Sequence, residues 1–209
     1  MGKGKLIFKY GCMGSGKSLQ LLATANNFSE HGIPFLIFKS AIDTRDGGDV
    51  VRSRDGKERE CIEITQNDNL FTLISDIYNI RYDCNPNIEI IKWILVDEAQ
   101  FLTEQQVDEL AAIADTFGIS ILCYGLRTDF TTHLFPASKR LFEIADSFDE
   151  IKSSCYCGSK TIFNARINQH SEIELNGEQI EPGGDSRYTS LCRKCFFQKA
   201  QNKYYSQEL

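Results

Sequence analysis

Polar and apolar positions follow two different periods along the first three quarters of the chain. Short apolar runs rich in β-branched residues predict strands at 6–10, 33–38, 88–96 and 119–124. Helical spacing of apolar residues predicts helices at 18–28, 70–78 and 103–117. Because strands and helices alternate through about residue 150, the pattern predicts an α/β fold with a parallel sheet and helices on both of its faces.

Local signals sharpen some of these boundaries. Thr103 and Gln106 have the spacing of a capping box, and Gly118 is placed to end the helix that follows them. Asp68 is the expected N-cap of the preceding helix. The polar segment 40–60 is predicted to be a long loop or a loose hairpin, a length that is often functional.

The pattern changes after Ser153. Hydrophobic helices are no longer expected, and Gly, Asn, Ser and Cys become frequent. Within this part of the chain, residues 158–191 are expected to be too polar to form a core of their own. We therefore expect an α/β nucleotide-binding domain at 1–151 and a small metal-stapled domain at 152–209.

Composition and charge narrow the class of protein. The chain has 209 residues, 42% hydrophobic residues and a net charge of −6, which is ordinary for a globular protein. An acidic balance lowers the expectation of a nucleic-acid partner, since phosphate binding needs a basic face. The apolar stretches are too short for a signal peptide or a membrane span, so we expect a cytoplasmic protein without membrane or nucleic-acid partners.

A phosphate-binding loop follows the first predicted strand. The run Gly11-Cys12-Met13-Gly14-Ser15-Gly16-Lys17-Ser18 matches G-x-x-x-x-G-K-[ST] at every fixed position. Its glycines let backbone N–H groups cradle phosphates at the start of a helix. Lys17 is expected to reach the β- and γ-phosphates of ATP, and the Ser18 hydroxyl to bind Mg²⁺. An incidental glycine-rich turn is the alternative.

Two acids lie at the end of the most apolar predicted strand. Asp97 occupies the place of a Walker-B carboxylate, which would hold Mg²⁺ at the carboxyl edge of the sheet. Glu98 points elsewhere by strand alternation and is free to accept a proton from an attacking hydroxyl. In an ATPase the same glutamate would polarise water. The remaining alternative is that the two acids only interact favourably with the dipole of the helix that follows them.

Four of the eight cysteines form two close pairs. Cys155 and Cys157, with Cys192 and Cys195, supply the four thiolates of a closed, structural Zn²⁺ site. The alternatives are reduced cysteines in a core, or a redox pair. The βαβ context of a redox C-x-x-C is missing around Cys192.

With these elements the chain resembles the zinc-containing P-loop thymidine kinases. The resemblance rests on residues 11–18, 43–45, 97–101, 124–130, 183–188 and 192–195. It implies a RecA-like P-loop fold and transfer of the γ-phosphate of ATP to the 5′-hydroxyl of thymidine, with Lys17 and Glu98 as catalytic residues and Glu98 as the base. Salvage of pyrimidine deoxynucleotides, deoxyuridine as second substrate, feedback inhibition by dTTP and a homotetramer are also implied.

The resemblance implies site residues as well. Those near ATP, besides the loop 11–18, are Ser53, Arg54, Asp97, Glu98, Ala99 and Gln100. Those near the nucleoside are Met13, Phe101, Leu126, Phe130, Phe135, Arg166, Gln179, Ile180, Glu181, Pro182, Gly183 and Tyr188. In the family the segment between the cysteine pairs forms a lasso over the nucleoside. Pro182 departs from the aliphatic residue of the animal enzymes and removes a backbone donor.

Two other functions compete with this interpretation. Asp97-Glu98-Ala99-Gln100 also resembles the Walker-B box of RecA-like or helicase-type ATPases that act on nucleic acid. Stimulation of ATP turnover by DNA, and not by thymidine, would support that function. The other is a non-enzymatic zinc module that senses a nucleotide, which would not need a base at Glu98.

Overall fold

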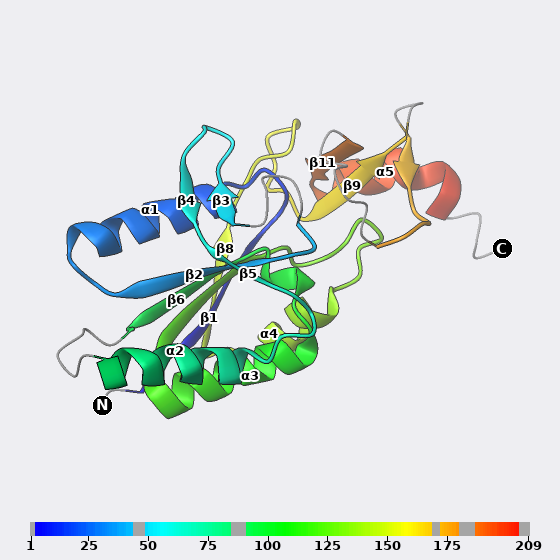
Figure 1. Cartoon of the computed structure of the whole chain (residues 1–209). Coiled ribbons are helices and arrows are strands. Elements are labelled where there is room, and N and C mark those ends of the chain that lie inside the picture. Colours follow the sequence, from blue (N-terminus) through cyan, green and yellow to red (C-terminus); the bar gives the residue numbers. More distant parts are fainter. Residues whose placement is uncertain (1–2, 44–48, 85–90, 169–171, 180–186, 205–209) are drawn as a thin grey trace.

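A six-stranded, wholly parallel sheet forms the centre of the computed structural model, which describes residues 3–43, 49–84, 91–168, 172–179 and 187–204 (Figure 1). The strand order is β5-β2-β6-β7-β1-β8. The strands are β1 (Leu6–Gly11), β2 (Phe35–Ser40), β5 (Ile62–Ile64), β6 (Trp93–Asp97), β7 (Ser120–Gly125) and β8 (Ser147–Ile151). The prediction of a parallel α/β sheet is confirmed.

Helices cover both faces of this sheet (Figure 1). One face carries α1 (Lys17–Glu30), whose buried side chains Leu21, Leu22 and Phe28 pack on the sheet, as does Val51 of the neighbouring hairpin. The other face carries α2 (Leu70–Cys84), α3 (Glu104–Phe117) and α4 (Pro136–Ile144). Burial on both sides explains why β6 and β7 have almost continuous apolar sequences.

Several local predictions hold. Thr103 and Gln106 form both hydrogen bonds of the capping box, and Gly118 ends α3 with φ 67°. The polar segment contains a short antiparallel hairpin of β3 (Val50–Arg52) and β4 (Glu58–Glu60). Residues 44–48, which include Arg45, lie outside the described residues.

The predicted cap of α2 is wrong by one residue. Asn69 Oδ1 accepts from the N–H of Thr72 at 2.7 Å, which is the N-cap interaction. Asp68 instead accepts from the N–H of Thr65 at 2.6 Å, within the preceding turn. Asp68 and Asn69 are both residue types that cap helices, and Asn69 is the cap because Asp68 is used in the preceding turn.

The C-terminal part contains a second sheet with its own small core. The order is β10-β9-β11, built from β9 (Phe163–Ile167), β10 (Ile173–Glu174) and β11 (Tyr188–Leu191). Helix α5 (Arg193–Tyr204) packs against it through Phe196 and Ala200. Residues 158–191, which were expected to be too polar for a core, contribute the buried Ala165, Ile173 and Leu191, and α5 completes this core. Aromatic neighbours Phe163, Phe196 and Phe197 supply that core.

Candidate active site

The phosphate loop connects β1 to α1 in the predicted way. Gly14 and Gly16 have φ values of 72° and 87°, a left-handed conformation that favours glycine, and α1 begins at Lys17. Lys17 is buried, and its Nζ donates to the Cys12 carbonyl at 3.1 Å. The Ser15 hydroxyl oxygen is buried without a hydrogen-bond partner among the described residues. A phosphate oxygen would satisfy it, so the loop fits the group that its sequence predicts.

The end of β8 and the β3–β4 hairpin both lie against this loop. A Cβ added at Gly11 would collide with the Ser15 side chain and the Ile151 carbonyl, so only glycine fits there. Arg54 Nη1 lies 3.3 Å from where a Cβ on Gly14 would be, which places its guanidinium over the loop. Ser53 is buried in the β3–β4 turn, where its hydroxyl lies 3.1 Å from the Lys57 carbonyl. The hairpin thus brings a cation to the place where a triphosphate would lie.

Asp97, the last residue of β6, lies beside the phosphate loop. Ser18 Oγ donates to Asp97 Oδ1 at 3.4 Å, which joins the start of α1 to the end of β6. Burial and, to a smaller extent, the neighbouring charge of Glu98 together raise the pKa of Asp97 to about 7. A hydroxyl and a carboxylate oxygen are the ligands that Mg²⁺ prefers, so these residues fit that ion.

Glu98 adopts an unusual backbone conformation directly after this strand. Its φ is 50°, so a left-handed turn, and not the alternation of β6, sets the direction of its side chain. Gln100 Nε2 donates to Glu98 Oε2 at 2.5 Å, and Gln100 Oε1 accepts from the N–H of Leu126 at 2.8 Å. Both side chains are buried. The Gln100 amide therefore ties the Glu98 carboxylate to Leu126, at the end of the neighbouring strand β7. Ala99, which opens the one-turn helix at 99–101, is fully buried in the core.

Several of the apolar side chains predicted to contact the nucleoside lie around the end of β7. Phe101 and Phe135 lie edge to face, with ring centroids 6.0 Å apart. Leu126, Phe130 and Phe135 are buried, whereas Met13 is half-buried on the phosphate loop. These side chains come from three loops at one edge of the sheet, as expected for a ligand site of this fold class.

Arg166, on β9, contacts these apolar side chains through the Phe130 ring. Its guanidinium carbon lies 3.6 Å from the centroid of the Phe130 ring, a cation–π contact. The same buried side chain forms an ion pair with Glu174 at 2.8 Å and donates to the carbonyls of Asn176 and Glu178. Arg166 therefore holds residues 174–178 against the loop after β7 that carries Phe130.

The other predicted nucleoside residues have different outcomes. Tyr188 lies opposite Arg166 in the β9–β11 register. Gln179 Nε2 donates to Asp129 Oδ2 at 2.8 Å, which ties this segment to the loop after β7. Ile180, Glu181, Pro182 and Gly183 lie outside the described residues.

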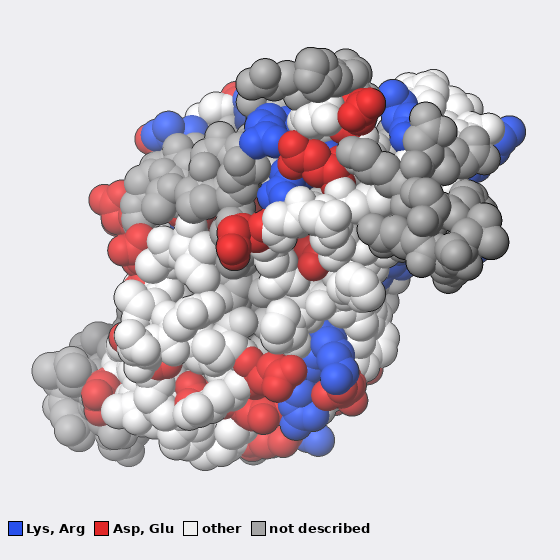
Figure 2. Space-filling view, turned by 90° about the vertical axis from the view of Figure 1, so that its right-hand side faces the viewer, with Lys and Arg blue, Asp and Glu red and all other residues white. Residues whose placement is uncertain are grey.

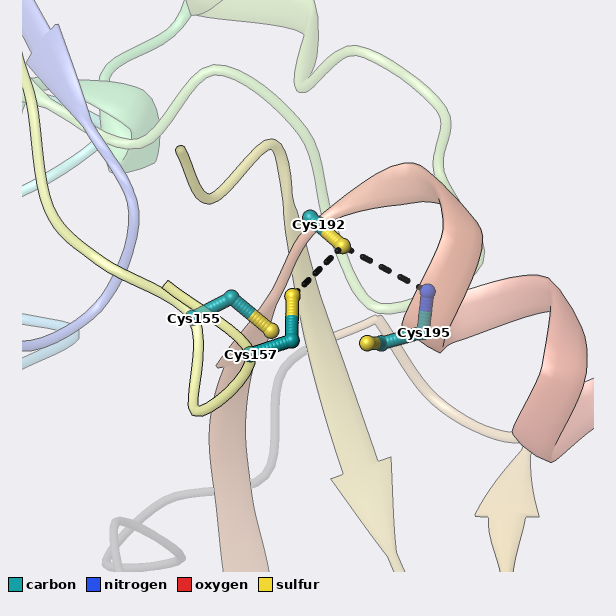
Figure 3. Close-up of side chains that lie close together, drawn as sticks. All are labelled: Cys155, Cys157, Cys192 and Cys195. Carbon is teal, nitrogen blue, oxygen red and sulfur yellow. Dashed lines mark hydrogen bonds between the residues drawn. The ribbon is translucent and has the colours of Figure 1, made fainter. Parts of the chain in front are cut away.

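The four predicted cysteines come together as a cluster (Figure 3). Their sulfur atoms all lie within 4.8 Å of one another, and Cys157 and Cys192 are 3.6 Å apart. A tetrahedral zinc–thiolate site requires separations of about 3.8 Å between sulfurs. Hydrogen bonding to Ser159 lowers the pKa of Cys157 to about 6, which favours the thiolate that a metal needs. The cluster fits one zinc ion.

Sequence reasoning missed three residues that link the two sheets. Asn164 and Ser190, on β9 and β11, both bond to the main chain of Met13. Thr128 is buried, and its hydroxyl makes no hydrogen bond within the described part of the chain. Asn164 and Ser190 are small polar residues in segments without a recognisable motif, and only their long-range contacts identify them. Thr128 lies within the run 124–130 that carries the family resemblance, but nothing in that run marks its side chain.

On the side of the molecule shown in Figure 2, the described Lys and Arg residues do not form a continuous basic surface. Figure 2 shows the side of the molecule that carries the second sheet, where Lys and Arg are interspersed with Asp and Glu. Ion pairs such as Arg187–Glu174 and Lys160–Glu150 account for part of this mixing. A strand of phosphates would need a continuous basic surface. Within the described ranges, no helix combines the length and apolar character that crossing a bilayer requires.

The glycine loop at the end of β1, with an acidic strand end beside it, defines a P-loop nucleotide-binding protein. β7 separates the loop strand from the acidic strand. The family model "Thymidine kinase" matches residues 4–196. The chain therefore belongs to the thymidine kinase family.

Curated relatives agree with this assignment over nearly their whole length. Thymidine kinase of Zymomonas mobilis is 43% identical over 195 residues, 93% of this chain and 97% of the relative. The enzyme of Streptococcus pyogenes is 40% identical, covering 92% and 97%, and that of Coxiella burnetii is 42% identical, covering 92% and 94%. A genome packaging NTPase, B204 of Sulfolobus turreted icosahedral virus 2 in complex with ATP-gammaS, is a distant structural match with TM-score 0.44, 14% identity and coverage of 76% and 79%.

Proposed function

We propose that this protein transfers the γ-phosphate of ATP to the 5′-hydroxyl of thymidine and yields dTMP for deoxynucleotide salvage. The observation that carries the proposal is the contact between Ser18 and Asp97 at 3.4 Å, which brings together two side chains that would bind Mg²⁺, beside the buried Glu98. Family membership supports the choice of a nucleoside over water or DNA as the acceptor.

Each residue in this site has a specific task in in-line transfer. Main-chain N–H groups of the loop and Lys17 bind the phosphates, and Arg54 adds charge from the β3–β4 hairpin. Ser18 and Asp97 would hold Mg²⁺, which neutralises phosphate charge when bound. Glu98 accepts the proton of the 5′-hydroxyl, because its carboxylate is buried and held by Gln100.

The nucleoside would bind between the loop after β7 and the second sheet. Phe101, Leu126 and Phe135 supply apolar surface, whereas Arg166 braces Phe130 from behind. An apolar pocket discriminates a single methyl group only weakly, so deoxyuridine is expected to be a second substrate. Base reading by residues 179–183, inhibition by dTTP and a homotetramer remain predictions from the family resemblance.

Zinc has a structural role in this proposal. The four cysteines join the turn before β9 to the start of α5. Four thiolates leave no open position for substrate, which is typical of structural zinc. The metal would therefore stabilise the sheet that carries Arg166 and Tyr188.

Replacing Glu98 with Gln tests the proposal. The carboxamide keeps the size of the side chain but cannot accept the proton, so kcat with thymidine should fall by about two to four orders of magnitude. ATP affinity should stay within about twofold of wild type. Glu104→Gln, an exposed change at the start of α3, is the matched control. Full turnover by Glu98→Gln, or DNA-stimulated ATP hydrolysis without thymidine phosphorylation by the wild type, would contradict the proposal.

A further inference from the structure

The second sheet holds one residue of the phosphate loop, Met13, through hydrogen bonds to both its N–H and its carbonyl. The N–H of Met13 donates to Asn164 Oδ1 at 2.7 Å, and the Met13 carbonyl accepts from Ser190 Oγ at 2.6 Å. Asn164 and Ser190 face each other across the antiparallel β9–β11 pair. A register pair of one sheet thus holds residue 13 of the other domain.

Asn164 also connects Met13 to the loop after β7. Its Nδ2 donates to the Thr128 carbonyl at 3.0 Å, and its side chain is only 3% exposed. Thr128 lies two residues from Phe130, the ring that Arg166 covers. One buried amide therefore joins the phosphate loop to the strand end that would carry the nucleoside.

The position of this grip within the loop is informative. Because the Met13 N–H donates to Asn164, it is not available to a phosphate. The next residue, Gly14, has φ 72° and no side chain that could fix it. A flexible glycine-rich loop loses conformational entropy when it is ordered by a bound nucleotide, and this entropy cost weakens binding. Because Met13 is already held before the nucleotide binds, part of this cost is removed.

We propose that Asn164 and Ser190 are positioning residues for the nucleotide: they hold the phosphate loop in its binding conformation, so that ATP affinity depends on the second sheet. The inference rests on the proposed function for the identity of the nucleotide. It assigns to β9 and β11 a role in ATP binding in addition to covering the nucleoside.

The test is direct nucleotide binding in the absence of thymidine. Mg²⁺–ATP is titrated calorimetrically into wild type, Asn164→Ala and Ser190→Ala. Loss of two buried hydrogen bonds should raise the Kd of Asn164→Ala about tenfold, and loss of one should raise that of Ser190→Ala about threefold or more. Because both side chains hold the same residue, Met13, the double variant should lose less than the product of the two factors.

Kinetics separate positioning from general damage. KM for ATP should rise in parallel with Kd, whereas kcat at saturating ATP should stay within about threefold of wild type. A merely structural defect would lower the active fraction, and so kcat, without raising KM. Ser190→Thr keeps the hydroxyl and should restore affinity. Thr189→Ala, on the exposed side of the same strand, is the matched control.

Unchanged ATP affinity in Ser190→Ala and in a folded Asn164→Ala would overturn the inference. If Asn164→Ala fails to fold, the comparison of Ser190→Ala with Ser190→Thr decides it alone. Wild-type protein that binds ATP but does not phosphorylate thymidine would refute the proposed function and leave this inference standing.

Discussion

Gln100→Met should separate the placement of the base from the binding of ATP. Gln100 is 2% exposed and makes two hydrogen bonds, at 2.5 Å to the Glu98 carboxylate and at 2.8 Å from the Leu126 N–H. Methionine keeps the length and apolar stem but neither polar atom. The carboxylate then loses a charge-assisted donor, and a buried N–H loses its acceptor.

Both losses can be estimated. A hydrogen bond to a charged group contributes about 1.5–3 kcal/mol, so kcat should fall about ten- to a hundredfold if that bond holds the base in its reactive position. The unsatisfied Leu126 N–H should cost about 1–3 kcal/mol of stability, which lowers Tm by roughly 3–9 °C in a chain of this size.

The assays are steady-state phosphorylation of thymidine at saturating substrates, ATP titration and thermal unfolding. Gln100→Glu provides the contrast, because it keeps the side-chain shape and places a second carboxylate against Glu98. A Gln100→Met enzyme with kcat within twofold of wild type would refute the reasoning. Equal losses in ATP affinity and kcat would also refute it, since Gln100 would then act on the loop.

Three further predictions concern the metal ligands, the acidic strand end and the cation–π contact. Cys192→Ser should abolish stoichiometric zinc, measured by elemental analysis, and expose the C-terminal sheet to limited proteolysis; retained zinc would contradict the four-thiolate site. The folded-state pKa of Asp97, about 7, exceeds the unfolded value of about 4, so stability without Mg²⁺ should fall as pH rises between these values. Asp97→Asn should lack that fall in thermal unfolding in EDTA at pH 5 and 8, and an identical fall would disprove the assignment. Arg166→Lys keeps the charge but loses the planar contact with Phe130, so KM for thymidine should rise about tenfold with ATP affinity kept, and an unchanged KM would exclude the bracing role.

The sequence predicted those parts of the fold that depend on near neighbours. The phosphate loop, its strand and its helix lie within one short segment, and the capping box at Thr103 needs only residues three apart. The cysteine cluster was also predictable, because two close pairs limit what the chain can do with them. In each case the chemistry is contained in residue types at fixed spacing.

Features that depend on tertiary context were missed. β8 is an edge strand whose first three residues are exposed, so it lacks the apolar pattern of β6 and β7. α5 buries only one side on a small sheet, and its sequence is mostly polar. The left-handed turn at Glu98 has no sequence signal, since glycine is the residue expected there. Asn164 and Ser190 became recognisable only through partners far away in the chain.

The bonds to Met13 also determine when the phosphate loop is complete during synthesis. They span 151 and 177 positions in the sequence, so the ribosome must release most of the chain before either can form. All six strands of the larger sheet precede β9, so they can pair earlier, because chains fold from the N-terminus as they emerge. A nascent chain that ends before β9 therefore carries the glycine loop without its support. Nucleotide affinity in this enzyme is a property of the finished chain, and truncation after β8 should weaken it while leaving the larger sheet paired.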